Sequence, residues 1–261
     1  MSGEDSAVGL AADSWVPGGK PDPVAARKHG LIGAQLPRVD GALKVQGKAP
    51  FAAEVPLDGM LYAALAFSTV ARGRITALDS AAAEASSGVA LVMTHLNCPR
   101  LNAIPSFLSA GKSISGDDLP VMQDDVVHWN GQPIALVLAG TQEQADHAAA
   151  LVRATYEVEP ATTAFAAAKA GETNTGEFFG HPLRDEVGDA EAALSAAAFR
   201  VDQRYSTPRH NHNAIEPHAV TLAWDGDRLT AYDCTQGVAH TAWSYAYAFG
   251  IDESQVHVIA Q

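Results

Sequence analysis

The chain has 261 residues, with 30 Asp and Glu against 17 Lys and Arg, so its formal net charge is -13. This acidic balance argues against binding to nucleic acid or to anionic membrane surfaces. Hydrophobic residues make up 47% and charged residues 18%, which is enough apolar material for a buried core in one or two domains. The longest apolar runs, Met60–Phe67 and Pro133–Ala139, fall short of the roughly 18 residues needed to cross a bilayer.

The opening segment, MSGEDSAVGLAADSW, is acidic and has no basic stretch followed by an apolar one, so it contains no visible export signal. We therefore expect a cytoplasmic protein. The two cysteines of the sequence, Cys98 and Cys234, form no CxxC pair. This excludes a disulfide framework, a cysteine-rich zinc site and a self-contained iron–sulfur cluster.

The first structural signals come after a Gly-, Pro- and Ala-rich start, which we interpret as a disordered tail or linker over residues 1–35. Residues 61–94 then predict a strand–helix–strand unit. Its strands are GMLYAALAFS and Val89–Thr94. The Ala-rich helix between them is capped by Asp79 or Ser80.

The excursion over residues 95–122 is too long for a simple connection, and loops of this length tend to be functional or flexible. After it, Asn130-Gly131 between two strand-like runs predicts a β-hairpin. Thr141 and Gln144 have the spacing of a capping box that opens an Ala-rich helix, and the strand TYEVEP follows. Residues 36–160 are therefore expected to form one α+β domain.

A Gly-, Asn- and Thr-rich stretch predicts an inter-domain linker over residues 161–185. Gly188-Asp189 then opens another Ala-rich helix, and FRVDQRYSTP after it is strand-like. Residues 186–261 are expected to begin a second domain.

The rest of this second domain shows a hairpin, a helix and one more strand. Asp225–Asp227 predicts a turn between the strands HAVTLAW and RLTAYDCT. AHTAWSYAYAFG predicts a helix that ends at Gly250. QVHVIAQ begins a further strand at the end of the sequence. Because domains tend to end in surface segments, we expect the chain to be a fragment or to be completed by another polypeptide.

The densest polar cluster is RHNHNAIEPHA. In an extended strand His210 and His212 share one face, as do Glu216 and His218, which are ligand types for a non-haem iron or zinc site. The alternative is that these are hydrogen-bonded polar side chains, and Pro217 breaks the regularity that a metal site needs. The residues alone favour this second interpretation.

Thr235-Gln236-Gly237 ends one predicted strand and opens a helix, a place where a side-chain amide and backbone N–H groups can face a ligand. The alternative is an ordinary helix start. Cys234 before it is better explained as an inert, partly buried thiol than as a nucleophile. The sequence contains no GxSxG, P-loop, HExxH or GxGxxG motif.

Three blocks together resemble the large, molybdopterin-binding subunit of the xanthine dehydrogenase and aldehyde oxidase family. The first is RVDGALKVQGKAPFAAEVPLDGMLYAALAFSTVARGRITALDSAAAE, the second is GQPIALVLAGTQEQADHAAALVRATYE, and the third is HNAIEPHAVTLAWDGDRLTAYDCTQGV. Their order and spacing agree with the N-terminal portion of that subunit, and residues 1–33 lie outside the resemblance.

The resemblance implies an α/β-hammerhead domain followed by the first part of a molybdopterin-binding domain. It also implies a bacterial-type oxidoreductase that hydroxylates an aldehyde or an N-heterocycle with molybdenum bound to the cytosine dinucleotide form of molybdopterin. Electrons would leave through iron–sulfur and flavin centres on partner subunits. The scarcity of cysteine agrees with that division.

The resemblance assigns Thr235-Gln236 and the neighbouring Gly237 to the cofactor site, where the Gln amide hydrogen-bonds an oxo ligand of molybdenum. The family commonly has Ser where this chain has Cys234. The family's GGGFG loop and its general base, a Glu, would lie beyond residue 261, so this chain contains no catalytic residue and we expect it to be inactive alone. Two alternatives remain: a non-catalytic interaction module, and a metalloenzyme using the His and Glu cluster above.

Overall fold

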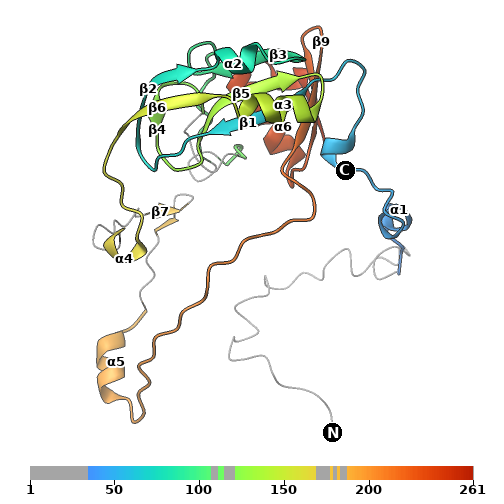
Figure 1. Ribbon diagram of the computed structural model, residues 1–261. Coiled ribbons are helices and arrows are strands. Elements are labelled where there is room, and N and C mark those ends of the chain that lie inside the picture. Colours follow the sequence, from blue (N-terminus) through green and yellow to red (C-terminus); the bar gives the residue numbers. More distant parts are fainter. Residues whose placement is uncertain are drawn as a thin grey trace. The chain divides into compact units, whose positions relative to one another are not determined.

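The structure is a computed structural model that describes residues 35–106, 111–114, 121–168, 177–178, 181–182 and 187–260 (Figure 1). The predicted tail over residues 1–35 lies almost wholly outside the described residues. The chain divides into two units, Met1–Ala49 and Pro50–Gln261. In the described part of the first unit, the short helix α1 (Gly41–Val45) follows Asp40, whose pKa is lowered to about 2 mainly by a hydrogen bond from Arg38.

The second unit begins with a mixed helix and strand region up to residue 160. Its elements are η2 (Ala52–Glu54), β1 (Tyr62–Phe67), β2 (Gly73–Asp79), α2 (Ala81–Glu84), β3 (Val89–Thr94), β4 (Val126–Val127), β5 (Pro133–Ala139), α3 (Gln142–Ala149) and β6 (Arg153–Val158). The strands form two antiparallel three-stranded sheets, in the orders β1-β5-β3 and β4-β2-β6. Mixed helix and antiparallel sheet confirm the predicted α+β class.

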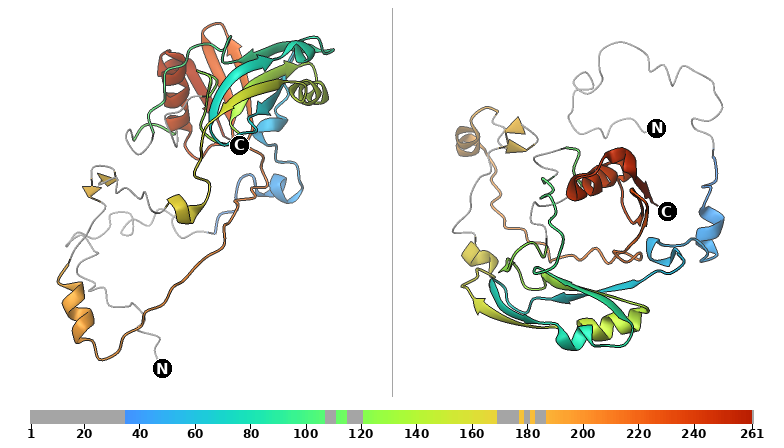
Figure 2. Two further views of the ribbon diagram at one scale, coloured as in Figure 1. Left: turned by 60° about the vertical axis from the view of Figure 1, so that its left-hand side comes forward. Right: turned by 90° about the horizontal axis from the view of Figure 1, so that it is seen from above.

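The core of this region is built from small side chains. α3 presents Ala145, Ala148 and Ala149 to the sheet, a spacing that places all three on one helical face. Because alanines let backbones approach closely, α3 packs directly on β1 and β5, where Val137 is fully buried. Figure 2 shows α2 and α3 together on the same side of the sheet β1-β5-β3.

The prediction of a strand–helix–strand unit over residues 61–94 omits one strand, because β2 lies between β1 and α2. β1 and β3 are not neighbours but lie on either side of β5. The sequence does not predict β2 because Arg72, Gly73 and Arg74 resemble a turn, although Gly73 and Ile75 are both buried on one face of the strand.

The predicted hairpin at Asn130-Gly131 is wrong. The chain does turn there, with Gly131 at a φ of +87°, but β4 and β5 belong to different sheets. The buried side chain of Gln132 takes the place of a strand partner, since it accepts from His128 N and donates to Val126 O, both at 2.8 Å. A turn signal in the local sequence does not indicate which sheet each flanking strand joins.

Half of the predicted capping box is present at α3. Thr141 Oγ1 accepts a hydrogen bond from Gln144 N at 3.3 Å. The Gln144 side chain lies instead against Gly88, where a Cβ atom would be 2.2 Å from Gln144 Oε1. Gly88 is therefore needed both for this contact and for its own φ of +82°.

The second unit continues after residue 160 through a connection that is only partly described. Its elements are α4 (Phe165–Ala168), β7 (Glu177–Phe178), β8 (His181–Pro182), α5 (Ala190–Ala196), β9 (Val220–Asp225), β10 (Arg228–Asp233), α6 (Val238–Phe249), η4 (Glu253–Gln255) and β11 (Val256–Ile259). Asp189 caps α5 as its sequence predicts, accepting from Ala192 N. None of the described helices is long and apolar enough to span a bilayer.

The strand predicted over residues 199–208 is wrong, because these residues form no regular element. Phe199, Val201 and Tyr205 are 93%, 79% and 85% exposed, so no described neighbour supplies a ladder or a core for them. Period-two alternation alone does not make a strand when there is no partner to bond with.

The predicted hairpin between β9 and β10 is confirmed, with Arg228 paired to Asp225 and Gly226 in the turn at a φ of +60°. α6 follows β10 and ends at Gly250 in the left-handed conformation, as its sequence predicts. The chain then returns as β11, which pairs in parallel with β10. β10, α6 and β11 therefore form a strand–helix–strand crossover.

A hydrogen bond joins the end of β10 to α6. Tyr245 Oη donates to Asp233 Oδ2 at 2.8 Å. Burial and, next, the Asp233 carboxylate raise the pKa of Tyr245 above its usual range, because both disfavour the phenolate. The turn after β10 is thus tied to the helix that follows it.

We expect Gly73→Ala to destabilise the protein strongly. A Cβ at Gly73 would lie 2.2 Å from the backbone oxygen of Glu157, in the middle of the sheet β4-β2-β6. The free energy of unfolding, measured with urea, should fall by about 3 kcal/mol. Gly131→Ala is the matched control, because its φ is also positive but nothing lies within 4 Å of the new atom. It should cost only about 1 kcal/mol; equal losses in the two variants would contradict the steric account.

Tyr245→Phe should lower the free energy of unfolding by about 1 to 3 kcal/mol at pH 7, since it removes a hydrogen bond to a charged acceptor. The pKa of Tyr245 is raised in the folded state, so its contribution is complete below the pKa of an unfolded tyrosine and is lost as pH rises toward the folded pKa. The difference between parent and variant should therefore shrink above about pH 10. A pH-independent difference in urea denaturation would show that the hydrogen bond is not its source.

Candidate functional site

The turn Thr235-Gln236-Gly237 lies where two parallel strands end together. Tyr232 near the end of β10 pairs with Ile259 at the end of β11, so both strands finish at the same edge of the sheet. The same edge carries the N-terminal end of α6, which begins at Val238. The carboxyl edge of parallel strands beside a helix N-terminus is a common ligand-binding position.

Hydrogen bonds hold this turn in one conformation. Thr235 Oγ1 accepts from Gly237 N at 3.1 Å and lies 2.8 Å from Thr241 Oγ1. Thr241 is buried in the first turns of α6 and its own N–H donates to Gly237 O. Thr235 is therefore bonded to the interior of the turn, and the next residue, Gln236, is exposed.

Gln236 is exposed, and its side-chain amide forms no hydrogen bond with any of the described residues. Gly237 is the N-cap of α6, where it provides no side-chain acceptor for the first helical N–H groups. Cys234 on the other side is half-buried. The turn thus offers one free amide and a helix terminus on a fixed backbone.

The His and Glu cluster forms no such site. Residues 209–219 have no regular structure, and His210, His212 and His218 are exposed. Within the described part of the chain, no three His, Cys, Asp or Glu side chains are placed to share a metal ion. The metal interpretation failed because it assumed a strand over this segment.

Glu216 instead contacts the beginning of the second unit. Its Oε1 accepts from Ala52 N at 3.3 Å, while Thr221 Oγ1 donates to Ala52 O at 2.9 Å. Both backbone groups of the buried Ala52 are therefore bonded to residues more than 160 positions away. This pair of bonds fastens η2 to the start of β9.

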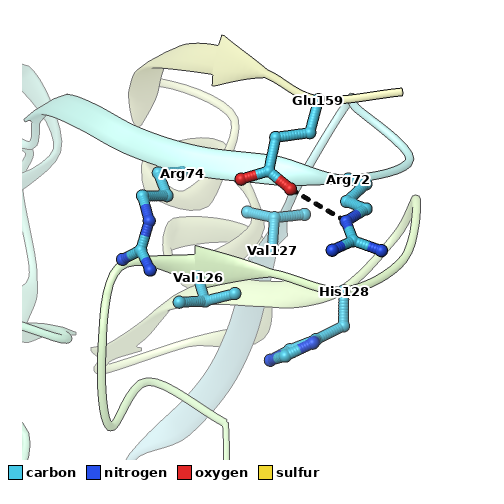
Figure 3. A pocket seen from close by; sticks show the side chains of 6 residues that line it. All are labelled: Arg72, Arg74, Val126, Val127, His128 and Glu159. Carbon is cyan, nitrogen blue, oxygen red and sulfur yellow. Dashed lines mark hydrogen bonds and ion pairs between the residues drawn. The ribbon is translucent and has the colours of Figure 1, made fainter. Parts of the chain in front are cut away.

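A cavity of about 210 Å³ lies elsewhere, at the end of the sheet β4-β2-β6 (Figure 3). Its lining consists of Arg72, Arg74, Val126, Val127, His128 and Glu159. Both arginines are already paired, Arg72 with Glu159 and Arg74 with Asp125, each at 2.8 Å. It includes none of the residues that the sequence assigned to a site.

The sequence did not identify a segment that crosses from the first region to α6. We call residues 98–106 and 111–114, which belong to the long excursion between β3 and β4, the strap. Asn102 N donates to Ala248 O at 3.0 Å and Asn102 Nδ2 to Tyr247 O at 2.9 Å. The strap therefore satisfies two carbonyl groups at the C-terminal end of α6.

Further along, the strap is bonded to the middle of α6. Ile114 N donates to Oγ of the buried Ser244 at 3.0 Å. Ile114 Cδ1 lies 3.7 Å from the position that a Cβ on Gly237 would occupy. The Ile114 side chain is thus beside the candidate turn, one residue from Gln236. No local sequence pattern indicates such a contact.

Two family models match the chain. The model described as "Aldehyde oxidase and xanthine dehydrogenase, a/b hammerhead domain" matches residues 46–160. The model described as "Molybdopterin cofactor-binding domain" matches residues 171–261, which include the candidate turn.

Curated relatives and solved structures agree with these models. An aldehyde oxidoreductase molybdenum-binding subunit of Escherichia coli is 32% identical over 236 residues, which cover 88% of this chain and 30% of that protein. The nicotinate dehydrogenase large molybdopterin subunit of Eubacterium barkeri is 31% identical, with 89% of this chain and 54% of that subunit covered. The aldehyde oxidoreductase structure from Desulfovibrio gigas is similar in fold, with a TM-score of 0.69 and 24% identity over 86% of this chain and 26% of that one.

The chain therefore spans about a third to a half of the length of these relatives. The hammerhead and molybdopterin-binding models match consecutive parts of the chain in the order that its sequence predicts. The chain belongs to the aldehyde oxidase and xanthine dehydrogenase family of molybdenum-dependent oxidoreductases, in which it corresponds to the N-terminal part of the molybdopterin-binding subunit.

Proposed function

We propose that these residues form the N-terminal part of a molybdenum hydroxylase large subunit that oxidatively hydroxylates an aldehyde or an N-heterocycle. The observation that carries the proposal is the exposed amide of Gln236 at the shared end of β10 and β11, which bonds to none of the described residues. It lies in the segment matched by the molybdopterin cofactor-binding model. The proposed domains are residues 36–160 and 186–261, joined by a linker over 161–185.

The described residues fit a bound molybdopterin group at this edge. Gln236 would donate a hydrogen bond from its amide, and a neutral donor stabilises negative charge without competing as a metal ligand. Thr235 would keep the turn fixed through Gly237 N and Thr241. Gly237 leaves the approach to the first N–H groups of α6 without a side chain. The cofactor, when bound, supplies the two-electron oxidation chemistry.

The cofactor form and the electron partners belong to the same proposal. We assign the cytosine dinucleotide form of molybdopterin, together with partner subunits that carry iron–sulfur and flavin centres. Two cysteines without a CxxC pair cannot hold an iron–sulfur cluster, which supports electron-transfer centres outside these 261 residues. We place the complex in the cytoplasm as part of the same proposal.

Replacing Gln236 by Ala should lower kcat/KM about 100-fold to 1,000-fold in the cofactor-loaded protein made from the native gene, the usual cost of losing one preorganised donor. Gln203→Ala is the matched control, because Gln203 is also exposed and unbonded to described residues but lies outside the turn. Molybdenum content, measured by mass spectrometry, separates a loss of cofactor from a loss of turnover. Equal activity in the two variants at equal molybdenum content would contradict the proposed role.

The 261 residues expressed alone should fold but show no turnover of aldehydes or N-heterocycles with an artificial electron acceptor. The family resemblance implies a general base beyond residue 261, and without it the proton transfer step is lost. Circular dichroism and a thermal melt would establish folding before the assay. Turnover by the isolated chain would overturn this expectation. Tight binding of a partner subunit without any molybdopterin would instead favour a non-catalytic interaction module.

A further inference from the structure

The side chain of Ile114 occupies a position that the proposed function does not yet explain. It is 47% exposed, although it is a large apolar group beside a polar turn. Its Cδ1 atom lies 3.7 Å from the position that a Cβ on Gly237, the neighbour of Gln236, would occupy. An apolar group left open beside the amide that would face the reaction can contact whatever small molecule approaches there.

Both described parts of the strap, residues 98–106 and 111–114, are bonded to α6. The amide N–H of Ile114 is bonded to the buried Ser244 in the middle of α6. Asn102 fixes the strap to the end of the same helix, and Gln123 Oε1 accepts from Leu101 N at 3.0 Å. Isoleucine is itself stiff because it is branched at Cβ. The backbone of Ile114 is therefore bonded to α6, and its side chain has little conformational freedom.

We propose that Ile114 is a specificity-determining residue: its side chain forms an apolar wall beside Gln236 that limits the size of the substrate group on that side. The inference rests on the proposed function and adds that the first domain, through the strap, contributes to substrate selection. A wall of this kind discriminates by size because each methylene gained or lost in an apolar pocket changes binding by about tenfold or more. The substrates concerned carry an apolar group next to the carbon that is oxidised.

The direct test changes the size of the wall in the cofactor-loaded protein made from the native gene. Ile114→Ala should raise kcat/KM for benzaldehyde relative to acetaldehyde, or for quinoline relative to pyridine, by at least about tenfold. Ile114→Phe should shift the same ratio in the opposite direction. Leu96→Ala is the matched control, because Leu96 is a 76% exposed apolar residue of the same excursion, and it should leave the ratio unchanged.

A second readout does not depend on turnover. Ile114→Cys introduces a thiol whose alkylation by N-ethylmaleimide is followed by peptide mass spectrometry, with Cys98 and Cys234 as internal references. Benzaldehyde or quinoline should slow alkylation at position 114 and not at the two native cysteines. Unchanged alkylation at position 114, or unchanged size ratios in active protein, would overturn the inference. Lack of turnover of every compound by the cofactor-loaded parent would count against the proposed function instead, while the alkylation result still decides the role of Ile114.

Discussion

The parallel pairing of β10 with β11 is the constraint on which the candidate site depends. Parallel strands require a crossover, and here α6 provides it, so the end of β10, the start of α6 and the end of β11 meet at one edge. The hydrogen bonds from Tyr245 to Asp233 and within the turn at Thr235 fix that edge. An exposed amide on a rigid turn is the arrangement that oriented hydrogen bonding to a ligand needs.

The region up to residue 160 is hydrogen-bonded to the elements that form this edge. Its first element, η2, is bonded through Ala52 to Glu216 and Thr221. Its long excursion is bonded to α6 at Ser244, Tyr247 and Ala248. Each of these bonds joins residues more than 120 positions apart. Changes in the region up to residue 160 can therefore alter the helix that carries the candidate turn, which is why Ile114 belongs to the description of the site.

The sequence predicted the elements whose signals are local. The hairpin at Gly226, the Asp189 cap and the helix end at Gly250 depend on residues within a few positions of each other. It failed where a distant partner determines the structure. β4 and β5 join different sheets, and the Gln132 side chain satisfies the backbone between them. Residues 199–208 have no partner strand among the described residues. The candidate site shows the same division. The family resemblance identified Gln236, whereas no residue near Ile114 in the sequence indicates that its side chain lies beside Gly237.

The central claim is that the edge at the ends of β10 and β11 faces a molybdopterin cofactor. A crystal structure of the cofactor-loaded protein made from the native gene tests it most directly. The account predicts the Gln236 side-chain nitrogen within about 3 Å of an acceptor atom on the cofactor, with the turn at Thr235 unchanged. A cofactor bound away from this edge, or Gln236 turned to solvent beside a bound cofactor, would contradict the account.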